Sequence, residues 1–563
     1  MDSNLLRTKS IEQLVGDVEH GSKALKRSLS AWDLTLLGIG AIIGTGIFVL
    51  TGTAAANQAG PSIMVSYLAA GLACGFAALC YAEFASMIPI AGSAYTYAYA
   101  TLGELVAWMI GWDLILEYAV GSMTVAIGWS GYMQKLLSGA GIHLPVWMSA
   151  APGTLDANGV SIGALINLPA VLIVLAITAL LVVGVQATAR ANAIMVSIKL
   201  VAIVFFIAVG ATYVKPENWE PFFAYGWQGT MAAAAVVFFA YIGFDAVSTT
   251  AEEAKNPQRD LPIGILSSLV VCTVLYLAVA AVLTGIVPVV ESKTDAAFLN
   301  APVAFALSLI GQDWAAYLVS AGAVAGITSV LLVMLLSQPR IFFAMSRDRL
   351  LPPGVSVVHP KYGTPYITTI ITGVVVAIVA GFTQIQTVGE MTSIGTLFAF
   401  VVVCAAVLIL RRTRPEAKRP FRVPGGGVLP VLGIVSCFYL MLSLPVVTWV
   451  RFLVWLDLGL IIYWVYGRTH STLANAAEQA KRTGMQALAN FITAFGALAL
   501  FNGFAMAILG FFTEWGITNE TTAKWHEIGV THEQADIFGL QVLGVSLVVF
   551  IIGRVLSKTS GEK

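Results

Sequence analysis

Long apolar stretches separated by short polar segments run along almost the whole chain. Fourteen of them have or approach the roughly 20 consecutive apolar residues that a transmembrane helix needs. These stretches cover residues 33–55, 62–87, 104–135, 164–187, 191–214, 229–251, 262–289, 314–339, 364–382, 388–410, 427–447, 452–468, 487–512 and 536–555. The pattern predicts an all-α integral membrane protein with 14 transmembrane helices.

The composition excludes an ordinary soluble protein. Of the 563 residues, 58% are hydrophobic and 11% are charged, whereas soluble domains contain about 45–50% apolar and about 25% charged residues. The net charge of zero gives no indication of nucleic-acid binding. The five cysteines lie inside apolar stretches without zinc-site spacing, and the sequence contains no P-loop, so we expect no metal, no cofactor and no use of ATP.

The basic residues predict the orientation in the membrane. With 14 spans both termini lie on one side, and that side receives 24 of the 30 Lys and Arg residues, whereas the other side receives five. Because cytoplasmic loops carry the excess of positive charge, we expect both termini in the cytoplasm, in a plasma-membrane protein. The first 30 residues are polar and carry no secretory signal.

Two predicted spans contain helix-breaking sequence near mid-membrane. Span 1 contains G-I-G-A-I-I-G-T-G-I-F at 38–48, and span 6 contains F-F-A-Y-I-G-F-D at 238–245. Small residues also allow close helix packing, but clustered glycines weaken the helix itself. Spans 1 and 6 are five apart, the spacing expected if two inverted repeats each begin with a helix that is broken at a binding site.

This organisation divides the chain into six parts. They are a cytoplasmic tail at 1–32, a first repeat at 33–214, a second repeat at 229–410, a basic cytoplasmic loop at 411–426, peripheral spans within 427–555 and a cytoplasmic tail at 556–563.

Several polar side chains fall inside the predicted spans. Lys199 lies about eight residues, or about 12 Å, from the cytoplasmic end of its span. Either it extends to the interface or it changes protonation state near neutral pH and carries a coupled proton. Glu117 shares a helix face with Asp113; it either receives a cationic group or forms structural hydrogen bonds. Ser329 either bonds back to its own helix or leaves room for a ligand side chain.

At these residues the chain resembles the amino acid, polyamine and organocation transporters, most closely the branch of cationic amino acid transporters with fourteen spans. The resemblance rests on the span 1 motif and on three further stretches. These are Y-A-E-F-A-S-M-I-P-I-A-G-S-A-Y-T-Y at 81–97, F-F-A-Y-I-G-F-D-A-V-S-T-T-A-E-E-A-K-N-P-Q-R-D-L-P at 238–262 and Q-P-R-I-F-F-A-M-S-R-D-R-L-L-P at 338–352.

The resemblance implies a five-plus-five inverted repeat with broken helices 1 and 6. The backbone N–H groups of Gly44, Thr45 and Gly46 would hold a substrate carboxylate, and Ile43 belongs to the same site. Carbonyls of Phe239, Ala240 and Ile242 would receive the ammonium, with Phe239 also acting as an aromatic gate. Lys199 resembles the lysine that replaces a sodium ion in proton-coupled members.

We therefore expect an amino acid transporter that is proton-coupled and sodium-independent and works by alternating access. We do not expect an enzyme. The expected partners are amino acids, protons and membrane lipid. Cationic and small neutral amino acids both remain open as substrates. Two other functions also remain open. One is a proton-pumping subunit of a respiratory complex, which would need a chain of ionisable groups across the membrane. The other is an amino acid sensor or channel with the same core.

Overall fold

The described residues fold into one bundle of helices. The computed structural model describes residues 7–9, 29–88, 93–154, 160–183, 189–249, 251, 254–357, 359 and 364–474. Within these ranges there is no β-strand, and only two isolated bridges occur. The predictions for spans 13 and 14, and for the parts of the chain beyond residue 474, fall outside the described residues.

The helices of eight or more residues follow the predicted spans closely. They are α2 (Ala31–Ile42), α4 (Ile63–Met87), α5 (Ser93–Thr101), α6 (Glu104–Gly139), α7 (Leu168–Val183), α8 (Ala189–Gly210), α9 (Gly226–Val237), α11 (Pro257–Ile286), α13 (Pro302–Leu309), α14 (Asp313–Arg347), α15 (Tyr366–Phe382), α16 (Ile385–Thr413), α17 (Val428–Leu442) and α18 (Val446–Ile462). The short helices α5 and α13 lie between predicted spans, and α14 continues eight residues beyond the predicted end at 339.

The helices have the length and composition of membrane spans. Seven helical stretches of the described chain are long and apolar enough to cross a membrane, and four shorter apolar helices have 10–17 residues. Their outer faces expose large apolar side chains such as Leu72, Val201 and Val270. Lipid accommodates such faces, whereas water does not, so the structure confirms an all-helical membrane protein.

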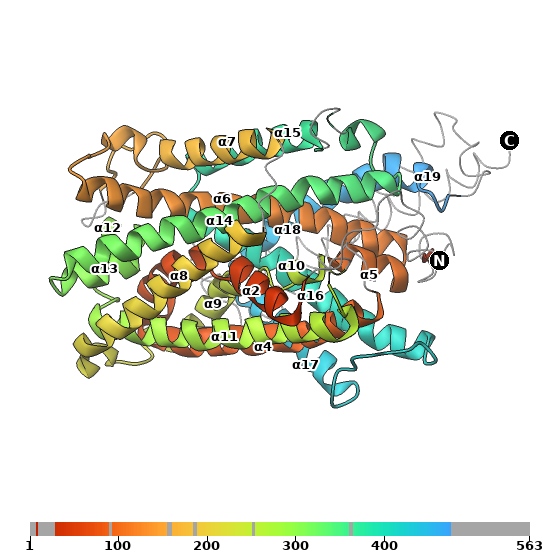
Figure 1. The fold of residues 1–563 in the computed structure, drawn as a ribbon, viewed down its shortest axis with the longest axis horizontal. Coiled ribbons are helices and arrows are strands. Elements are labelled where there is room, and N and C mark those ends of the chain that lie inside the picture. The colour runs from red at the N-terminus through yellow and green to blue at the C-terminus, as the bar shows by residue number, and fades with distance from the viewer. Residues whose placement is uncertain are drawn as a thin grey trace, which may run out of the picture.

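The breaks in spans 1 and 6 lie in the interior of this bundle. Figure 1 shows the long helices running side by side, with α7 and α15 along one edge and α4 and α11 along the opposite edge. Helices α2, α9 and α10 (Ala246–Thr249) lie between these edges. Helices α8, α11 and α14 pack against α2, and α6 contacts Thr45 just beyond its interrupted end.

Candidate functional site

The first break follows Ile42, the last residue of α2. Ile43 is extended, with φ −75° and ψ 104°, and the chain becomes helical again in η1 (Gly46–Leu50). Within the described chain, the backbone N–H groups of Gly44, Thr45 and Gly46 donate no hydrogen bond. All three residues are buried. Buried unpaired donors are rare in proteins unless water or a ligand satisfies them.

The second break follows α9. Helix α9 gives way to the turn η7 (Phe238–Tyr241), and Ile242 is extended, with φ −60° and ψ 138°. Gly243 has φ +113°, a conformation that residues with a Cβ rarely adopt. The carbonyl of Phe239 accepts a hydrogen bond from the N–H of Ile242 at 3.1 Å. Both predicted breaks are therefore present at the predicted residues.

The two breaks lie directly against each other. A Cβ atom on Gly46 would fall on the Cα and Cβ atoms of Ala240, so only glycine allows this approach. A Cβ atom on Gly243 would lie 2.9 Å from the carbonyl carbon and oxygen of Ala41. The glycines thus serve two purposes, since they interrupt the helices and let the interrupted backbones touch.

Lys199 reaches the first break from α8. Its side chain is fully buried, and its ammonium donates to the carbonyl of Ile43 at 2.7 Å and to the carbonyl of Gly40. These carbonyls belong to the C-terminal end of α2, where the helix dipole favours a positive charge. Gly326 of α14 makes room for the lysine, because a Cβ there would lie 2.7 Å from the Cβ of Lys199. The ammonium is therefore paired inside the protein, not extended to the membrane interface.

Two tyrosines that the sequence analysis did not single out bind the carbonyls of the breaks. The hydroxyl of Tyr276 donates to Ala240 at 2.7 Å and also reaches the carbonyl of Ile42 at 3.1 Å. The hydroxyl of Tyr67 lies 3.2 Å from the carbonyl of Gly46. Isolated tyrosines within apolar spans are a sequence signal for such a role, since a buried hydroxyl needs a partner.

Helices α6 and α14 enclose the first break from two sides. Thr45 packs against Gly128 of α6 and donates to the carbonyl of Val125 at 3.4 Å. Gly44 faces Val330 of α14, whose Cγ2 would lie 3.1 Å from an added Cβ. The neighbouring Ser329 is buried and donates back to the carbonyl of Gly326 at 2.7 Å. Val330, rather than Ser329, is the α14 side chain that faces Gly44.

Glu117 lies away from the first break. It precedes Val125 by about two turns of α6, or about 12 Å. It is buried in an acidic group with Asp113 of the same helix and Asp245, which follows the second break. Neither carboxylate oxygen of Asp113 has a hydrogen-bond partner among the described residues. The structure therefore places Glu117 near the second break and not beside Gly44–Gly46.

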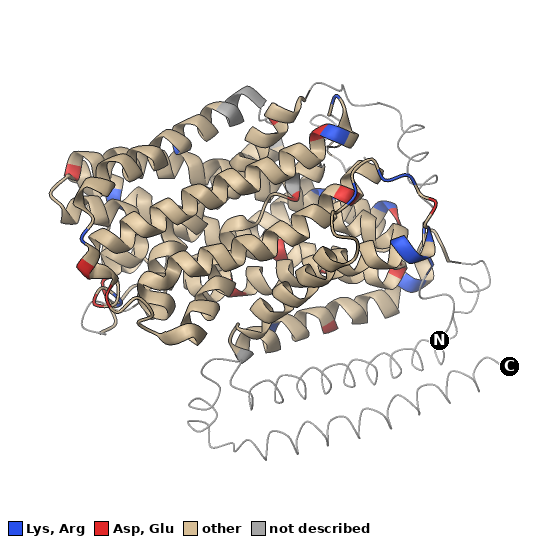
Figure 2. Ribbon diagram, turned by 90° about the horizontal axis from the view of Figure 1, so that it is seen from below, with Lys and Arg blue, Asp and Glu red and all other residues tan. Residues whose placement is uncertain are grey.

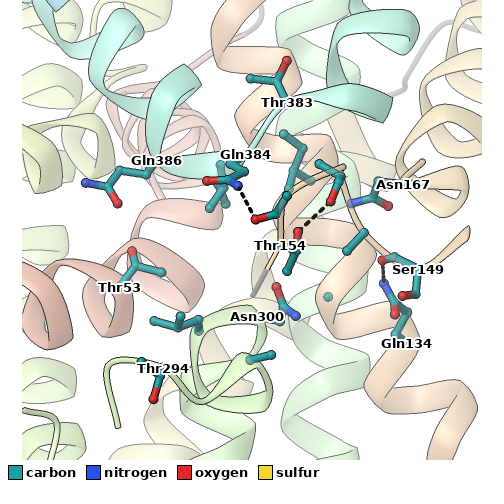
Figure 3. A pocket seen from close by; sticks show the side chains of 18 of the residues that line it. Thr53, Gln134, Ser149, Thr154, Asn167, Thr294, Asn300, Thr383, Gln384 and Gln386 are labelled. Atoms are coloured by element: carbon teal, nitrogen blue, oxygen red, sulfur yellow. Dashed lines mark hydrogen bonds between the residues drawn. The ribbon is translucent and has the colours of Figure 1, made fainter. Parts of the chain in front are cut away.

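A polar cavity lies about one helical turn along α6 from the residue that packs against Thr45 of the first break. It has a volume of about 360 Å³ and begins at Gly131 and Gln134, one to two turns along α6 from Gly128. Figure 3 shows amide and hydroxyl side chains from several segments around it, among them Asn300, Thr154 and Gln384. An adjoining cavity of about 350 Å³ shares Gly131 and Gln134. Among the residues that the structure describes, no Asp or Glu lines either cavity, whereas two lysines and a histidine do: Lys135, His143 and Lys293.

Ion pairs join segments at the opposite end of the bundle. Figure 2 shows most described Lys and Arg residues gathered at this end. Lys9 pairs with Asp348 at 2.8 Å, and Arg7 pairs with Glu104 at 3.4 Å. Tyr95 also donates to Asp348, at 2.7 Å; burial and the Asp348 carboxylate raise the pKa of Tyr95 well above its ordinary value, which keeps its proton on the hydroxyl.

The arrangement suits a small ligand with one negative and one positive group. Unpaired backbone donors at Gly44–Gly46 can bind a carboxylate, because the following helical segment adds the positive end of its dipole. Carbonyls of the facing break can accept from an ammonium. Neither interaction requires a charged side chain at the ligand, and the buried ammonium of Lys199 is occupied by carbonyls of the first break.

Comparison with known proteins identifies the family. Residues 29–467 match the amino acid permease family. The branched-chain amino acid permease BcaP of Bacillus subtilis (strain 168) is 52% identical over 84% of this chain and 100% of its own length. The methylthioribose transporter of the same organism is 50% identical over 84% and 99%, and the vacuolar cationic amino acid transporter 4 of Arabidopsis thaliana is 39% identical over 74% and 68%.

These relatives are permeases and transporters, not enzymes. The match also sets aside the alternative of a respiratory-complex subunit, since it covers most of the described helices. The recognition made from the four sequence stretches is confirmed: the chain belongs to the amino acid permease family.

Proposed function

We propose that the chain is a proton-coupled secondary transporter of neutral amino acids that works by alternating access. The observation that carries this proposal is the contact between two broken helices at Gly46 and Ala240 beside unpaired backbone donors. Such interrupted helices form the substrate sites of many secondary transporters. This contact supports a binding site between segments that can move relative to one another.

In this proposal the backbone recognises the parts that all amino acids share. The N–H groups of Gly44, Thr45 and Gly46 bind the α-carboxylate. Carbonyls of Phe239, Ala240 and Ile242 in the second break bind the α-ammonium. The carbonyls of Phe239 and Ala240 each already accept one hydrogen bond, but a carbonyl oxygen has a second lone pair for the ammonium. Phe239 covers the substrate, and Ile43 completes the site.

The substrate side chain is neutral in this proposal. The described lining of the two cavities contains Lys135 and Lys293 and no acidic residue, so its field disfavours a cationic side chain. The α14 side chain facing Gly44 is the apolar Val330, with Ser329 next to it. Glu117 lies about two helical turns of α6 from Val125, the residue that accepts from Thr45. The higher identity to a branched-chain permease than to a cationic transporter supports the same choice.

Lys199 couples the proton in this proposal. The protonated amine holds the end of α2 to α8 through the carbonyls of Gly40 and Ile43. Loss of the proton weakens these charge-assisted hydrogen bonds and frees the first break to move. Substrate and proton then bias one two-state element, which is the requirement for coupling.

The proposed architecture has fourteen spans in a plasma membrane, with residues 33–214 and 229–410 as inverted repeats. Both termini lie in the cytoplasm, so the end closed by Lys9 and Asp348 faces inward and the polar cavities face outward. The described structure is then an outward-facing state. A cavity open at one end and ion pairs across the other are what alternating access requires of such a state.

Uptake of L-leucine into proteoliposomes under an imposed pH gradient tests the proposal. The wild-type chain should accumulate leucine above its external concentration, and Lys199→Met should abolish accumulation while binding of leucine persists. Lys215→Met, which removes an exposed lysine, is the matched control and should behave like the wild type. Accumulation by Lys199→Met would contradict the coupling role. Leucine binding by the wild type without accumulation would indicate a sensor or channel.

A further inference from the structure

The basic side chains of the loop between α16 and α17 fall into two groups, one directed into the protein and one directed outward. Residues 411–426 contain six cations and a single acidic residue. Two of the cations, Arg411 and Arg419, are directed inward and pair with Glu83 of α4. Glu83 is 1% exposed and also accepts from the backbone N–H of Val423 at 2.8 Å.

Arg411 and Arg419 also fix the course of the loop backbone. The guanidinium of Arg419 donates to carbonyls of the loop at Ala417, 2.7 Å, and Arg414, 2.9 Å. Arg411 donates to the carbonyl of Gly426. The loop therefore has a defined shape that does not depend on its remaining cations.

Those remaining cations face outward. Arg412, Lys418 and Arg422 are exposed, and Arg414 is half-buried. Within the described chain none of the four side chains forms a hydrogen bond or an ion pair, and the only carboxylate of the loop, Glu416, is also exposed. A folded loop thus presents an uncompensated cluster of positive charge at one end of the bundle (Figure 2).

The helix that follows the loop supplies an apolar surface next to these cations. Val428, Val431, Leu432 and Val435 of α17 are 61%, 47%, 41% and 58% exposed. Their spacing of three, four and seven residues places them on one face of the helix. Figure 1 shows α17 and the loop before it at the outside of the bundle. Cations beside an exposed apolar helix face match the two parts of a phospholipid, the phosphate and the acyl chains.

We propose that Arg412, Lys418, Arg422 and the exposed face of α17 form a binding site for an anionic phospholipid. The guanidinium and ammonium groups bind the headgroup phosphate, and the acyl chains lie along Val428, Val431 and Val435. Each basic residue close to an anionic membrane surface contributes roughly a factor of five in affinity. The site depends on the chain lying in a membrane and is independent of the transported substrate.

Lipid retention tests this site. The full chain is reconstituted in equal parts of phosphatidylglycerol and phosphatidylcholine and purified in mild detergent, and the retained ratio of the two lipids is measured by mass spectrometry. The triple variant Arg412→Gln, Lys418→Gln, Arg422→Gln should lower the ratio of retained phosphatidylglycerol to retained phosphatidylcholine by about tenfold or more. The conservative variant Arg412→Lys, Arg422→Lys should retain the wild-type ratio.

A charge-matched triple variant controls for loss of net charge. Lys255→Gln, Arg259→Gln, Arg347→Gln removes three exposed cations from other segments and should leave the ratio unchanged. An unchanged ratio in the loop variant, or an equal fall in both triple variants, would overturn the proposal. Displacement of the retained lipid by glycerol 3-phosphate alone would also overturn it, because a soluble phosphate would then suffice. Size-exclusion profiles of all variants verify that they remain folded.

Discussion

The two ends of the helical bundle differ in the chemistry that holds their segments together. At one end, charged side chains join segments that lie far apart in the sequence, since Arg7 pairs with Glu104 and Lys9 pairs with Asp348 across 339 positions. At the other end neutral amides join separate segments, such as Gln134 to the carbonyl of Ser149 at 2.7 Å and Gln384 to that of Gly153 at 3.2 Å.

This difference indicates which end is closed. Ion pairs join several segments at one end, whereas the amide-bonded end encloses cavities of about 360 and 350 Å³. Opening the closed end requires separating paired charges, and closing the other end requires only the collapse of a hydrated space. In a transporter that alternates between two states, the binding of substrate and proton must supply the free energy needed to separate these paired charges.

The largest expected effect concerns Glu104, the centre of the closed end. This buried carboxylate accepts from Arg7, from Tyr463 at 3.0 Å, from Tyr99 at 3.3 Å and from Ser471. Glu104→Ala leaves these donors unpaired and should lower the free energy of unfolding by about 3–5 kcal/mol. Thermal or denaturant unfolding in detergent measures this.

The matched change at the open end is Gln134→Ala. It removes neutral hydrogen bonds beside a hydrated cavity, so it should lower the free energy of unfolding by about 1 kcal/mol. Equal losses for Glu104→Ala and Gln134→Ala would show that the two ends are not held differently.

A smaller effect is expected from Asp348→Asn, which removes the ion pair with Lys9 but keeps an acceptor for Tyr95. If this change lowers the free energy of opening this end by roughly 1.4 kcal/mol, the fraction of molecules open at this end rises about tenfold. A cysteine placed at the buried Thr396 of α16 should then react about tenfold faster with a soluble maleimide. The native cysteines give little background because all five are buried.

Lys293→Gln on the same Thr396→Cys background is the control, since it removes an exposed cation from the cavity end. It should leave the labelling rate unchanged. A labelling rate that does not respond to Asp348→Asn would show that the Lys9 pair does not hold this end closed.

The smallest expected effect concerns selectivity at the open end. Lys293 is the charged residue that lines the larger cavity. Lys293→Glu should raise uptake of arginine relative to leucine by roughly twofold to fivefold, because salt screens most of the effect of a hydrated charge. Competition between the two labelled amino acids measures the ratio. A ratio that stays constant with Lys293→Glu would remove the electrostatic argument for neutral substrates.

The sequence predicted the parts of the fold that depend on local chemistry. Clustered glycines weaken a helix through local backbone chemistry, so the sequence located both breaks correctly, although Gly38 and Gly40 of the same motif lie inside α2. Apolar length likewise located α4, α6, α11 and α16 to within a few residues of their ends. The helix α5 was missed because its sequence S-A-Y-T-Y-A-Y-A-T is neither long nor strongly apolar.

The partners of the polar residues could not be predicted in the same way. Lys199 was recognised as unusual from its depth, but its acceptors at Gly40 and Ile43 lie 159 and 156 positions away. Arg7 and Lys9 entered the sequence analysis only as charges that orient the chain, whereas the structure shows them in ion pairs. Contacts of this kind depend on how helices pack, and a single sequence does not contain that information.

The most direct test of the account is the position of a bound amino acid in an experimental structure of the full chain with L-leucine. We predict density for leucine between the two breaks, with its carboxylate at the backbone N–H groups of Gly44, Thr45 and Gly46 and its ammonium at the carbonyls near Phe239. Leucine bound only in the outer polar cavity, with helical hydrogen bonds closing both interruptions, would contradict it.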